Sequence, residues 1–385
     1  MVRFTKLTSF LALVVFCLLS VGFVSGWAKS RKNSAAAKAQ STDCVWTFDS
    51  YESSAWEKEW IAGEESGKRK DLECEMLAEK DEADRSVRLI KAVTGIVLDS
   101  ASTMPPDTIS LFSRMIYARR CGPDKVDTGE RRVQLIEPLI GILRDPLSIC
   151  PRPPSVPAEV HSTFGPLEND EQSKRHLLPG PLAPWSDTPN DPKSWHMNGM
   201  DTWTTSTHTP QKVLIDMGAS LYSNWHNNLS AVGASWFVER FKRHHLAFDW
   251  IVSYEIEKHE FDEIYKDVPD DVLPHYLYYN HGVVAAPGAR WNPWRILKGM
   301  SVTPGDYVAV KLDIDVPDIE ASLMDQLAKD DALRQRVDEV FFEHHVNVKV
   351  MVPYWGTGDL STTLKDSYSM FLALRIKGIR MHAWP

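Results

Sequence analysis

Carboxylate residues follow the apolar runs in the second half of this chain, at positions typical of a ligand site on the edge of a parallel sheet. The run Val213–Asp216 continues as Met-Gly-Ala-Ser220. A buried strand that leads into such a glycine turn exposes backbone N–H groups, and nucleotide-like cofactors bind there in doubly wound α/β domains. We therefore predict that four residues of this turn bind a cofactor. They are Asp216, Gly218, Ala219 and Ser220.

Two more polar residues at predicted strand ends extend this cofactor site. Glu255 follows an apolar run, and a carboxylate at that point accepts hydrogen bonds from ribose hydroxyls in dinucleotide-binding folds. Its separation from Asp216 exceeds the usual ~20 residues, so we expect a loop after the turn. The alternative is that Asp216 caps a helix and Glu255 is a solvated strand end. Asn280 ends another predicted strand, where it contacts a purine ring or simply forms a turn.

The run Val308–Leu312 leads into a pair of carboxylates, Asp313 and Asp315. Two carboxylates at this spacing hold a divalent cation or place a general base beside a cofactor. Proline is favoured in the first turn of a helix, so a helix is predicted to begin at Pro317. One of the two acids alternatively caps that helix.

A third strand-like run ends in Glu343, His344 and His345. Adjacent residues of a strand point to opposite faces, so only one of the two histidines can join a site on one face. We predict Glu343 and His344 as catalytic residues beside Asp313 and Asp315. These residue types also bind metal ions, but no metal ligand is assigned from the sequence.

Short apolar runs alternate with helical stretches from about Gln211 to Pro385. This alternation predicts an α/β fold, a doubly wound and mostly parallel sheet with helices on both faces. Helices are expected at Ala234–Phe241, after Pro317, and around Leu364 to Leu372. The predicted strands are Val213–Asp216, Trp250–Glu255, Tyr276–Val283, Tyr307–Asp313, Glu339–His345 and Ile379–Trp384.

The chain divides into five predicted segments. Residues 1–28 form a signal peptide or signal anchor, and residues 29–42 form a flexible stem. Residues 43–150 are a cysteine-bearing, mixed or helical region with helices near Ala55–Trp60 and Arg85–Leu98. Residues 151–204 are a connector, since many prolines exclude regular helix and sheet there. Residues 205–385 form the α/β domain.

The first segment and the cysteines indicate the secretory pathway. Basic residues precede an apolar run from Phe10 to Val24, which is a cleaved signal or an uncleaved membrane anchor. In the lumen, four of the five cysteines are predicted to form two disulfides of unassigned pairing. The net charge of −9 argues against a nucleic-acid partner. An acceptor for N-glycosylation lies at Asn228. The four cysteines are Cys44, Cys74, Cys121 and Cys150.

Together, these segments resemble the FkbM-type methyltransferase domain, which has a class I S-adenosylmethionine-dependent, Rossmann-like fold. The resemblance covers the C-terminal half of the chain. It implies S-adenosylmethionine as the cofactor and O-methylation of a glycan or another hydroxylated small molecule. It also implies that Asp313, or His344 acting with Glu343, takes the acceptor proton. The matching segments are Asp216–Ser220, Tyr254-Glu255, Asn280–Val283, Lys311–Asp315 and Phe342–His345.

Two departures from that family leave other function classes open. Tyr222 replaces the second glycine of the turn, which predicts a narrowed or closed cofactor pocket. Asp315-Val-Pro replaces a Glu-Gly pair on the substrate side. One alternative is a glycosyltransferase, in which Asp313 and Asp315 bind a nucleotide sugar through a divalent cation. The other is a non-catalytic protein with a degenerate methyltransferase fold.

Overall fold

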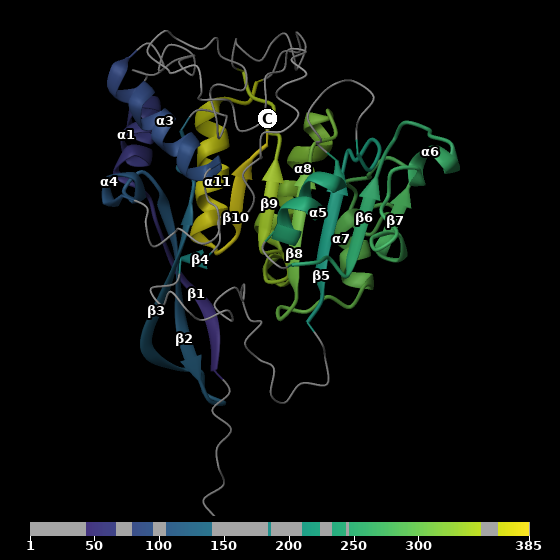
Figure 1. Ribbon diagram of the computed structural model, residues 1–385, viewed down its shortest axis with the longest axis horizontal. Coiled ribbons are helices and arrows are strands. Elements are labelled where there is room, and N and C mark those ends of the chain that lie inside the picture. Colours follow the sequence, from purple (N-terminus) through teal and green to yellow (C-terminus); the bar gives the residue numbers. More distant parts are fainter. Residues whose placement is uncertain are drawn as a thin grey trace, which may run out of the picture. The chain divides into compact units, whose positions relative to one another are not determined.

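Six parallel strands form the larger of two sheets in the computed structural model, which describes residues 44–66, 79–94, 105–140, 184–185, 210–223, 233–243, 246–347 and 361–384. Along the sheet the strand order is β10-β9-β8-β5-β6-β7, and every neighbouring pair is parallel (Figure 1). The predicted α/β fold with a parallel sheet is therefore confirmed. The strands are β5 (Lys212–Met217), β6 (Trp250–Tyr254), β7 (Tyr276–Tyr279), β8 (Tyr307–Leu312), β9 (Glu339–Phe342) and β10 (Arg380–Ala383).

Helices cover both faces of this sheet, which is why its central strands are mostly apolar. Every residue of β8 is buried. One face packs against α5, through Trp236, Phe237 and Phe241. The opposite face packs against α7, α8 and α11. The described helices of this half are α5 (Ala234–Arg243), α6 (Phe261–Tyr265), α7 (Pro293–Gly299), α8 (Pro317–Lys329), α9 (Asp331–Arg334) and α11 (Leu364–Ile376).

The chain order reverses between β5 and β8, which lie side by side at the centre of the sheet. The connection from β5 leads to β6 on one side, whereas β8 leads to β9 on the other. At such a reversal the loops that leave neighbouring strands diverge, and open α/β sheets bind ligands in the crevice outside the carboxyl ends of these strands. This edge is where the predicted site residues lie.

The cysteine-bearing region contains an antiparallel sheet of order β1-β2-β3-β4, which the sequence did not predict. The first six residues of β3 are exposed, and only its last five residues, Arg132–Ile136, form a strand-like run in the sequence. Two residues of the predicted connector form β4. The other residues of the connector lie outside the described part of the chain. The strands are β1 (Cys44–Glu52), β2 (Ser113–Cys121), β3 (Val126–Ile136) and β4 (Pro184–Trp185). The helices are α1 (Ala55–Glu65), α3 (Lys80–Thr94) and α4 (Pro106–Ile109).

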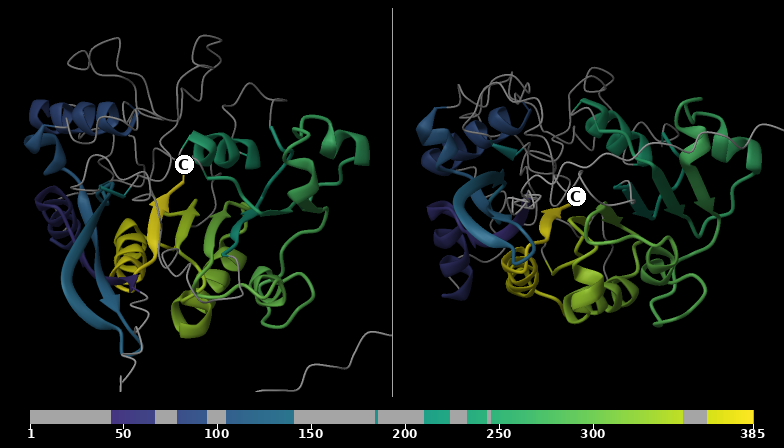
Figure 2. Two further views of the ribbon diagram at one scale, coloured as in Figure 1. Left: turned by 60° about the horizontal axis from the view of Figure 1, so that its bottom comes forward. Right: turned by 90° about the horizontal axis from the view of Figure 1, so that it is seen from below.

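Residues Thr42–Pro385 form one compact unit, so both sheets belong to the same body. Figure 2 shows α11 and β10 beside the elements of the N-terminal sheet, and α11 contacts both α1 and β1. The predicted leader and stem, the glycosylation acceptor Asn228, and the cysteines Cys74 and Cys150 lie outside the described residues. Within the part of the chain that the structure describes, no helix has the length and apolar character needed to cross a bilayer.

A disulfide joins Cys44 to Cys121, which face each other across β1 and β2. The bond closes a loop whose ends are 77 residues apart. We expect a Cys44→Ala/Cys121→Ala variant to lose about 2–4 kcal/mol of unfolding free energy, because the unfolded chain gains conformational freedom. Denaturant titration of the variant beside the oxidised wild-type protein measures the loss. Equal midpoints for the two proteins would refute this expectation.

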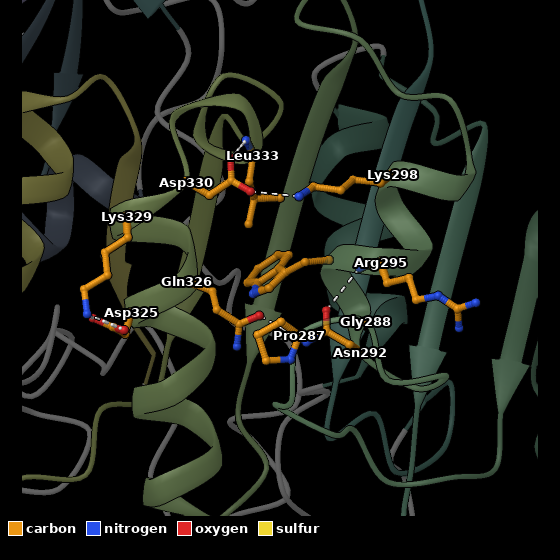
Figure 3. A pocket seen from close by; sticks show the side chains of 11 residues that line it. Pro287, Gly288, Asn292, Arg295, Lys298, Asp325, Gln326, Lys329, Asp330 and Leu333 are labelled. Atoms are coloured by element: carbon orange, nitrogen blue, oxygen red, sulfur yellow. Dashed lines mark hydrogen bonds and ion pairs between the residues drawn. The ribbon is translucent and has the colours of Figure 1, made fainter.

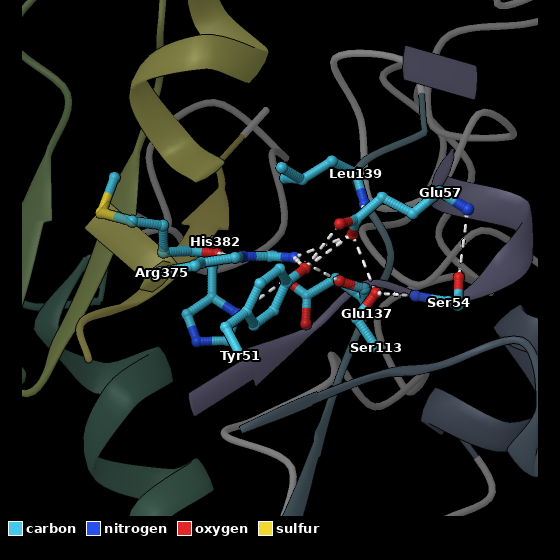
Figure 4. A network of polar contacts seen from close by, with 9 residues as sticks. Tyr51, Ser54, Glu57, Ser113, Glu137, Leu139, Arg375 and His382 are labelled. Atoms are coloured by element: carbon cyan, nitrogen blue, oxygen red, sulfur yellow. Dashed lines mark hydrogen bonds and ion pairs between the residues drawn. The ribbon is translucent and has the colours of Figure 1, made fainter. Parts of the chain in front are cut away.

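A buried polar network connects the N-terminal elements to the end of the parallel sheet (Figure 4). The guanidinium of Arg375 in α11 donates to the Tyr51 hydroxyl at 2.9 Å and to the Glu137 carbonyl at 2.9 Å, and lies 3.3 Å from the Glu57 carboxylate. Both Arg375 and Glu57 are fully buried. The imidazole of His382 in β10 lies 2.6 Å from the Glu137 carboxylate. Two regions distant in sequence are thus joined through charges that have no access to water.

Glu57 is the most heavily used carboxylate of this network. It also accepts hydrogen bonds from the Tyr51 hydroxyl at 2.7 Å, the Ser113 hydroxyl at 2.9 Å and the Leu139 backbone N–H at 2.8 Å. These donors come from β1, from β2 and from the segment after β3. A buried carboxylate is tolerated when its lone pairs are occupied in this way. Glu57 therefore joins the N-terminal elements to one another and, together with Tyr51 and Glu137, to Arg375 of α11.

Candidate functional site

The turn after β5 is the centre of the candidate site, and its conformation requires glycine at one position. Gly218 has φ of 77°, in the left-handed region. A β-carbon at this position would lie 1.5 Å from the Asp313 carbonyl oxygen. The turn and the end of β8 approach so closely that no side chain fits between them. Ser220 also has a positive φ, of 50°.

The backbone donors of this turn are used within the protein, which differs from the expectation that they face a ligand. The N–H groups of Gly218 and Ala219 both donate to the Tyr254 carbonyl, at 3.1 and 3.0 Å. The N–H of Ser220 donates to the Glu255 carboxylate at 2.7 Å. On the acceptor side, the Tyr278 hydroxyl donates to the Ser220 carbonyl at 2.6 Å. The turn is rigid, and these N–H groups are not available to bind an anion.

Glu255 remains partly exposed and retains acceptor capacity. Its other carboxylate oxygen accepts the Glu257 N–H at 2.7 Å. An ionised carboxylate has about four lone-pair sites, so two backbone N–H groups leave it able to accept hydroxyl donors. The Glu255 side chain therefore combines a fixed orientation with partial exposure beside the turn.

Asp216 is fully buried and supports the turn from inside the sheet rather than contacting a ligand. Its carboxylate lies 3.5 Å from the Lys311 ammonium on neighbouring β8, and burial raises the pKa of Asp216 to about 6. Lys311 is also buried, and it donates to the Gly218 carbonyl at 2.7 Å. The sequence interpretation did not assign a role to Lys311. The sequence nevertheless contained a signal for this contact. Lys311 and Asp313 are two residues apart along one predicted strand, so their side chains are expected on the same face.

Asp313 is held as an ionised carboxylate at the end of β8. Its side chain is 22% exposed, lies 3.1 Å from the Lys311 ammonium, and accepts the Trp384 indole N–H at 3.2 Å. Burial alone would raise the pKa of Asp313, but the Lys311 cation and the hydrogen bonds to Asp313 together outweigh burial and hold the pKa below its usual value. An acid stabilised in this way is a poor proton acceptor, which disfavours the predicted role of Asp313 as the base.

Three side chains form a cluster beside this turn, which we call the Asp315 cluster: Asp315, Glu343 and His345. The His345 Nε2 atom lies 3.2 Å from a Glu343 oxygen and 3.6 Å from an Asp315 oxygen. His345 and Glu343 are buried, whereas the Asp315 side chain is 82% exposed. Burial lowers the pKa of His345, but its hydrogen bond to Glu343 and the charges of the neighbouring carboxylates together outweigh burial, so the pKa is raised. The cluster can therefore exchange a proton or hold a cation at the surface of the sheet edge.

The predicted partner of Glu343 was the wrong histidine. Glu343 pairs with His345, whereas the His344 ring stacks on Phe342 at 4.9 Å and on Phe371 at 6.4 Å. Burial in this aromatic surrounding lowers the pKa of His344 to about 4. Glu343 and His345 directly follow β9 and are two residues apart, so they point to the same side of the chain, whereas His344 points to the other.

Two further predictions concern residues around β6 and β7. The Asn280 side chain stabilises a turn and is not free to bind a purine ring. Its oxygen accepts the His259 N–H at 3.0 Å, and its amide donates to the carbonyls of Glu255 and Glu257. The Tyr222 ring is buried in the core and packs edge-on against Tyr276, with the ring centroids 5.6 Å apart. Its side chain therefore points into the core beneath α5.

A separate cavity of about 490 Å³ lies along α7 and α8 (Figure 3). Its charged side chains are largely paired, since Lys298 contacts Asp330 at 2.8 Å and Lys329 contacts Asp325 at 2.8 Å. None of the predicted site residues lines it. The cavity is therefore distinct from the candidate site.

No protein-family model, curated protein or solved structure matches this chain. The function must accordingly be inferred from the geometry of the site itself.

Proposed function

We propose that this protein is an S-adenosylmethionine-dependent O-methyltransferase that acts on a glycan or another hydroxylated acceptor. The observation that carries the proposal is the charge of the sheet edge. Acidic side chains surround the turn after β5, while the N–H groups of its residues 218–220 are used internally. Such a site favours a cationic ligand over a phosphate-bearing one, which needs backbone donors or basic side chains. The carboxylates are Asp216, Glu255, Asp313, Asp315, Glu320 and Glu343.

The cofactor fits this description, because S-adenosylmethionine carries a sulfonium and an ammonium group and has no phosphate. The strand order supports the same proposal: counted along the chain, it is the 3-2-1-4-5-6 order of dinucleotide-binding folds. In our proposal the free lone pairs of Glu255 accept the ribose hydroxyls, and the turn at Gly218 supports the cofactor. When bound, the cofactor supplies an electrophilic methyl group.

The Asp315 cluster lies at the neighbouring strand ends, where an acceptor would meet the methyl group. As a bond forms between the acceptor oxygen and the methyl carbon, the bond from that carbon to sulfur breaks and sulfur keeps the electron pair. The hydroxyl proton passes to Asp315, the exposed carboxylate of the cluster. Proton transfer of this kind contributes about 10²–10⁴-fold to a rate, and orientation supplies much of the rest.

The glycosyltransferase alternative is less well supported by the geometry. It requires Asp313 and Asp315 to act together on a cation and a nucleotide diphosphate. Here Asp313 contacts Lys311 and Trp384, whereas Asp315 faces His345. The Asp313 carboxylate is therefore already held by a cation and an indole N–H, which leaves Asp315 as the more exposed of the two acids. We further propose, on the sequence alone, that the protein acts in the secretory pathway.

We expect Glu255→Gln to weaken binding of S-adenosylhomocysteine at least tenfold, because an amide accepts fewer hydrogen bonds from the ribose. Glu257→Gln is the matched control, because Glu257 is a nearby exposed acid. This variant should bind S-adenosylhomocysteine with the affinity of the wild-type protein. Isothermal titration of both full-length variants measures the difference. Equal affinity of the two variants would contradict the role of Glu255.

A further inference from the structure

The Asp315 cluster has the donor set of a metal site. It combines one imidazole nitrogen with two carboxylates that come from two different strand ends, and their candidate ligand atoms lie within 4.8 Å of one another. Imidazole suits zinc and other transition metals, and carboxylates suit manganese, magnesium and calcium. A mixed set of this kind is therefore suited to Mn²⁺ or Zn²⁺.

The separations within the cluster are close to those of a coordination sphere. Ligands bound to a metal at about 2.0–2.2 Å lie roughly 3.0–3.5 Å apart in octahedral or tetrahedral geometry. The His345 Nε2 atom is 3.2 Å from Glu343 and 3.6 Å from Asp315. All three candidate ligand atoms lie within 4.8 Å of one another. Two of the ligands are therefore buried and the third is on the surface.

A fourth carboxylate gives independent support for a cation at this position. Glu320 in α8 is 1% exposed, and one of its oxygens accepts the Ile314 N–H at 2.9 Å. Among the described residues, its other oxygen has no hydrogen-bond partner. The carboxylate of Glu320 is an electrostatic neighbour of His345, Asp313 and Asp315. A buried carboxylate oxygen without a partner is costly unless a positive charge lies nearby.

We propose that Asp315, Glu343 and His345 bind a divalent transition-metal ion, with the Glu320 carboxylate as an outer neighbour. Metal binding itself does not depend on the methyltransferase proposal. Its catalytic role rests on that proposal: the ion would hold the acceptor oxygen and lower the pKa of its hydroxyl group. The second oxygen of Asp315 would remain to receive the proton.

The test is titration of Mn²⁺ into chelator-treated full-length protein without cofactor, with free Mn²⁺ followed by electron paramagnetic resonance. We expect one equivalent to bind, and expect His345→Gln and Asp315→Asn each to weaken binding at least tenfold. Asp325→Asn removes an exposed acid from α8 and should leave binding unchanged. Because the Asp315 side chain is 82% exposed, its variant is expected to fold even where the His345 variant does not.

Absence of stoichiometric binding by the wild-type protein, or equal binding by Asp315→Asn, would overturn the metal site. Titration of S-adenosylhomocysteine in the presence of chelator is scored separately. Binding of Mn²⁺ without binding of S-adenosylhomocysteine would support the metal site and contradict the methyltransferase proposal. Binding of S-adenosylhomocysteine without binding of Mn²⁺ would contradict the metal site only.

Discussion

Replacing Arg375 with methionine is expected to lower the free energy of unfolding by about 3–5 kcal/mol, the largest stability effect predicted for this chain. The substitution removes a fully buried guanidinium while the Glu57 carboxylate stays buried. Tyr51 and the Glu137 carbonyl also lose a donor. An uncompensated buried charge costs more than the ion pair contributed, so the loss exceeds that of a surface pair.

Chemical denaturation of Arg375→Met beside Arg295→Met measures this effect. Arg295 is an exposed residue of α7, so its replacement should change stability by less than about 0.5 kcal/mol. A double variant, Arg375→Met with Glu57→Gln, should recover part of the loss because the buried negative charge is removed as well. A loss under about 1 kcal/mol for Arg375→Met alone would show that the network contributes little to stability.

This network also bears on the site, because Trp384, which contacts Asp313, directly follows β10. His382 lies 2.7 Å from the Glu339 carboxylate on β9, and Arg380 pairs with the same carboxylate at 2.9 Å. Two residues after His382, the Trp384 indole donates to Asp313. Loosening of β10 is therefore expected to disturb the position of Asp313 as well as the fold.

The second large effect is expected for Gly218→Ala, which should abolish cofactor binding and destabilise the protein by several kcal/mol. An L-residue in the left-handed region costs roughly 1–2 kcal/mol by itself. At Gly218 a β-carbon would also meet the Asp313 carbonyl at 1.5 Å, which forces the turn away from β8. Two causes therefore add at this position.

Gly288→Ala separates these two causes. Gly288 has the same φ of 77°, but nothing lies within 4 Å of its β-carbon position. The unfolding free energy of Gly288→Ala should therefore fall only by the cost of the left-handed conformation. The variant should keep the affinity of the wild-type protein for S-adenosylhomocysteine. Unfolding and binding measurements on both variants test the comparison. Similar losses for the two alanine variants would mean that the close approach to Asp313 has no consequence.

The parallel sheet could be predicted because its strands are covered on both faces. Such strands are short continuous apolar runs, and all six lie within the predicted ranges or differ from them by one residue. The antiparallel sheet was missed because its strands are partly solvated and because β1 pairs with β2 across a long stretch of sequence. The first half of β3, for example, is exposed and polar. A local pattern does not show the pairing of β1 with β2, whereas β2 and β3 form a hairpin with a short connection.

The candidate site was predicted in outline but not in its internal contacts. The sequence placed the carboxylates at one sheet edge, since strand ends of a parallel sheet converge there. It did not reveal that the N–H groups of Gly218 and Ala219 bind the Tyr254 carbonyl, because this depends on the close packing of β5 and β6. The choice of His344 over His345 was avoidable, since alternation from Glu343 already favoured His345.

The most direct test of the proposed function is isothermal titration of the purified full-length protein with two ligands in turn. We predict saturable, micromolar binding of S-adenosylhomocysteine and no binding of a nucleoside diphosphate in the presence of Mn²⁺. Binding of the nucleoside diphosphate with Mn²⁺, and none of S-adenosylhomocysteine, would contradict the methyltransferase proposal and favour the glycosyltransferase.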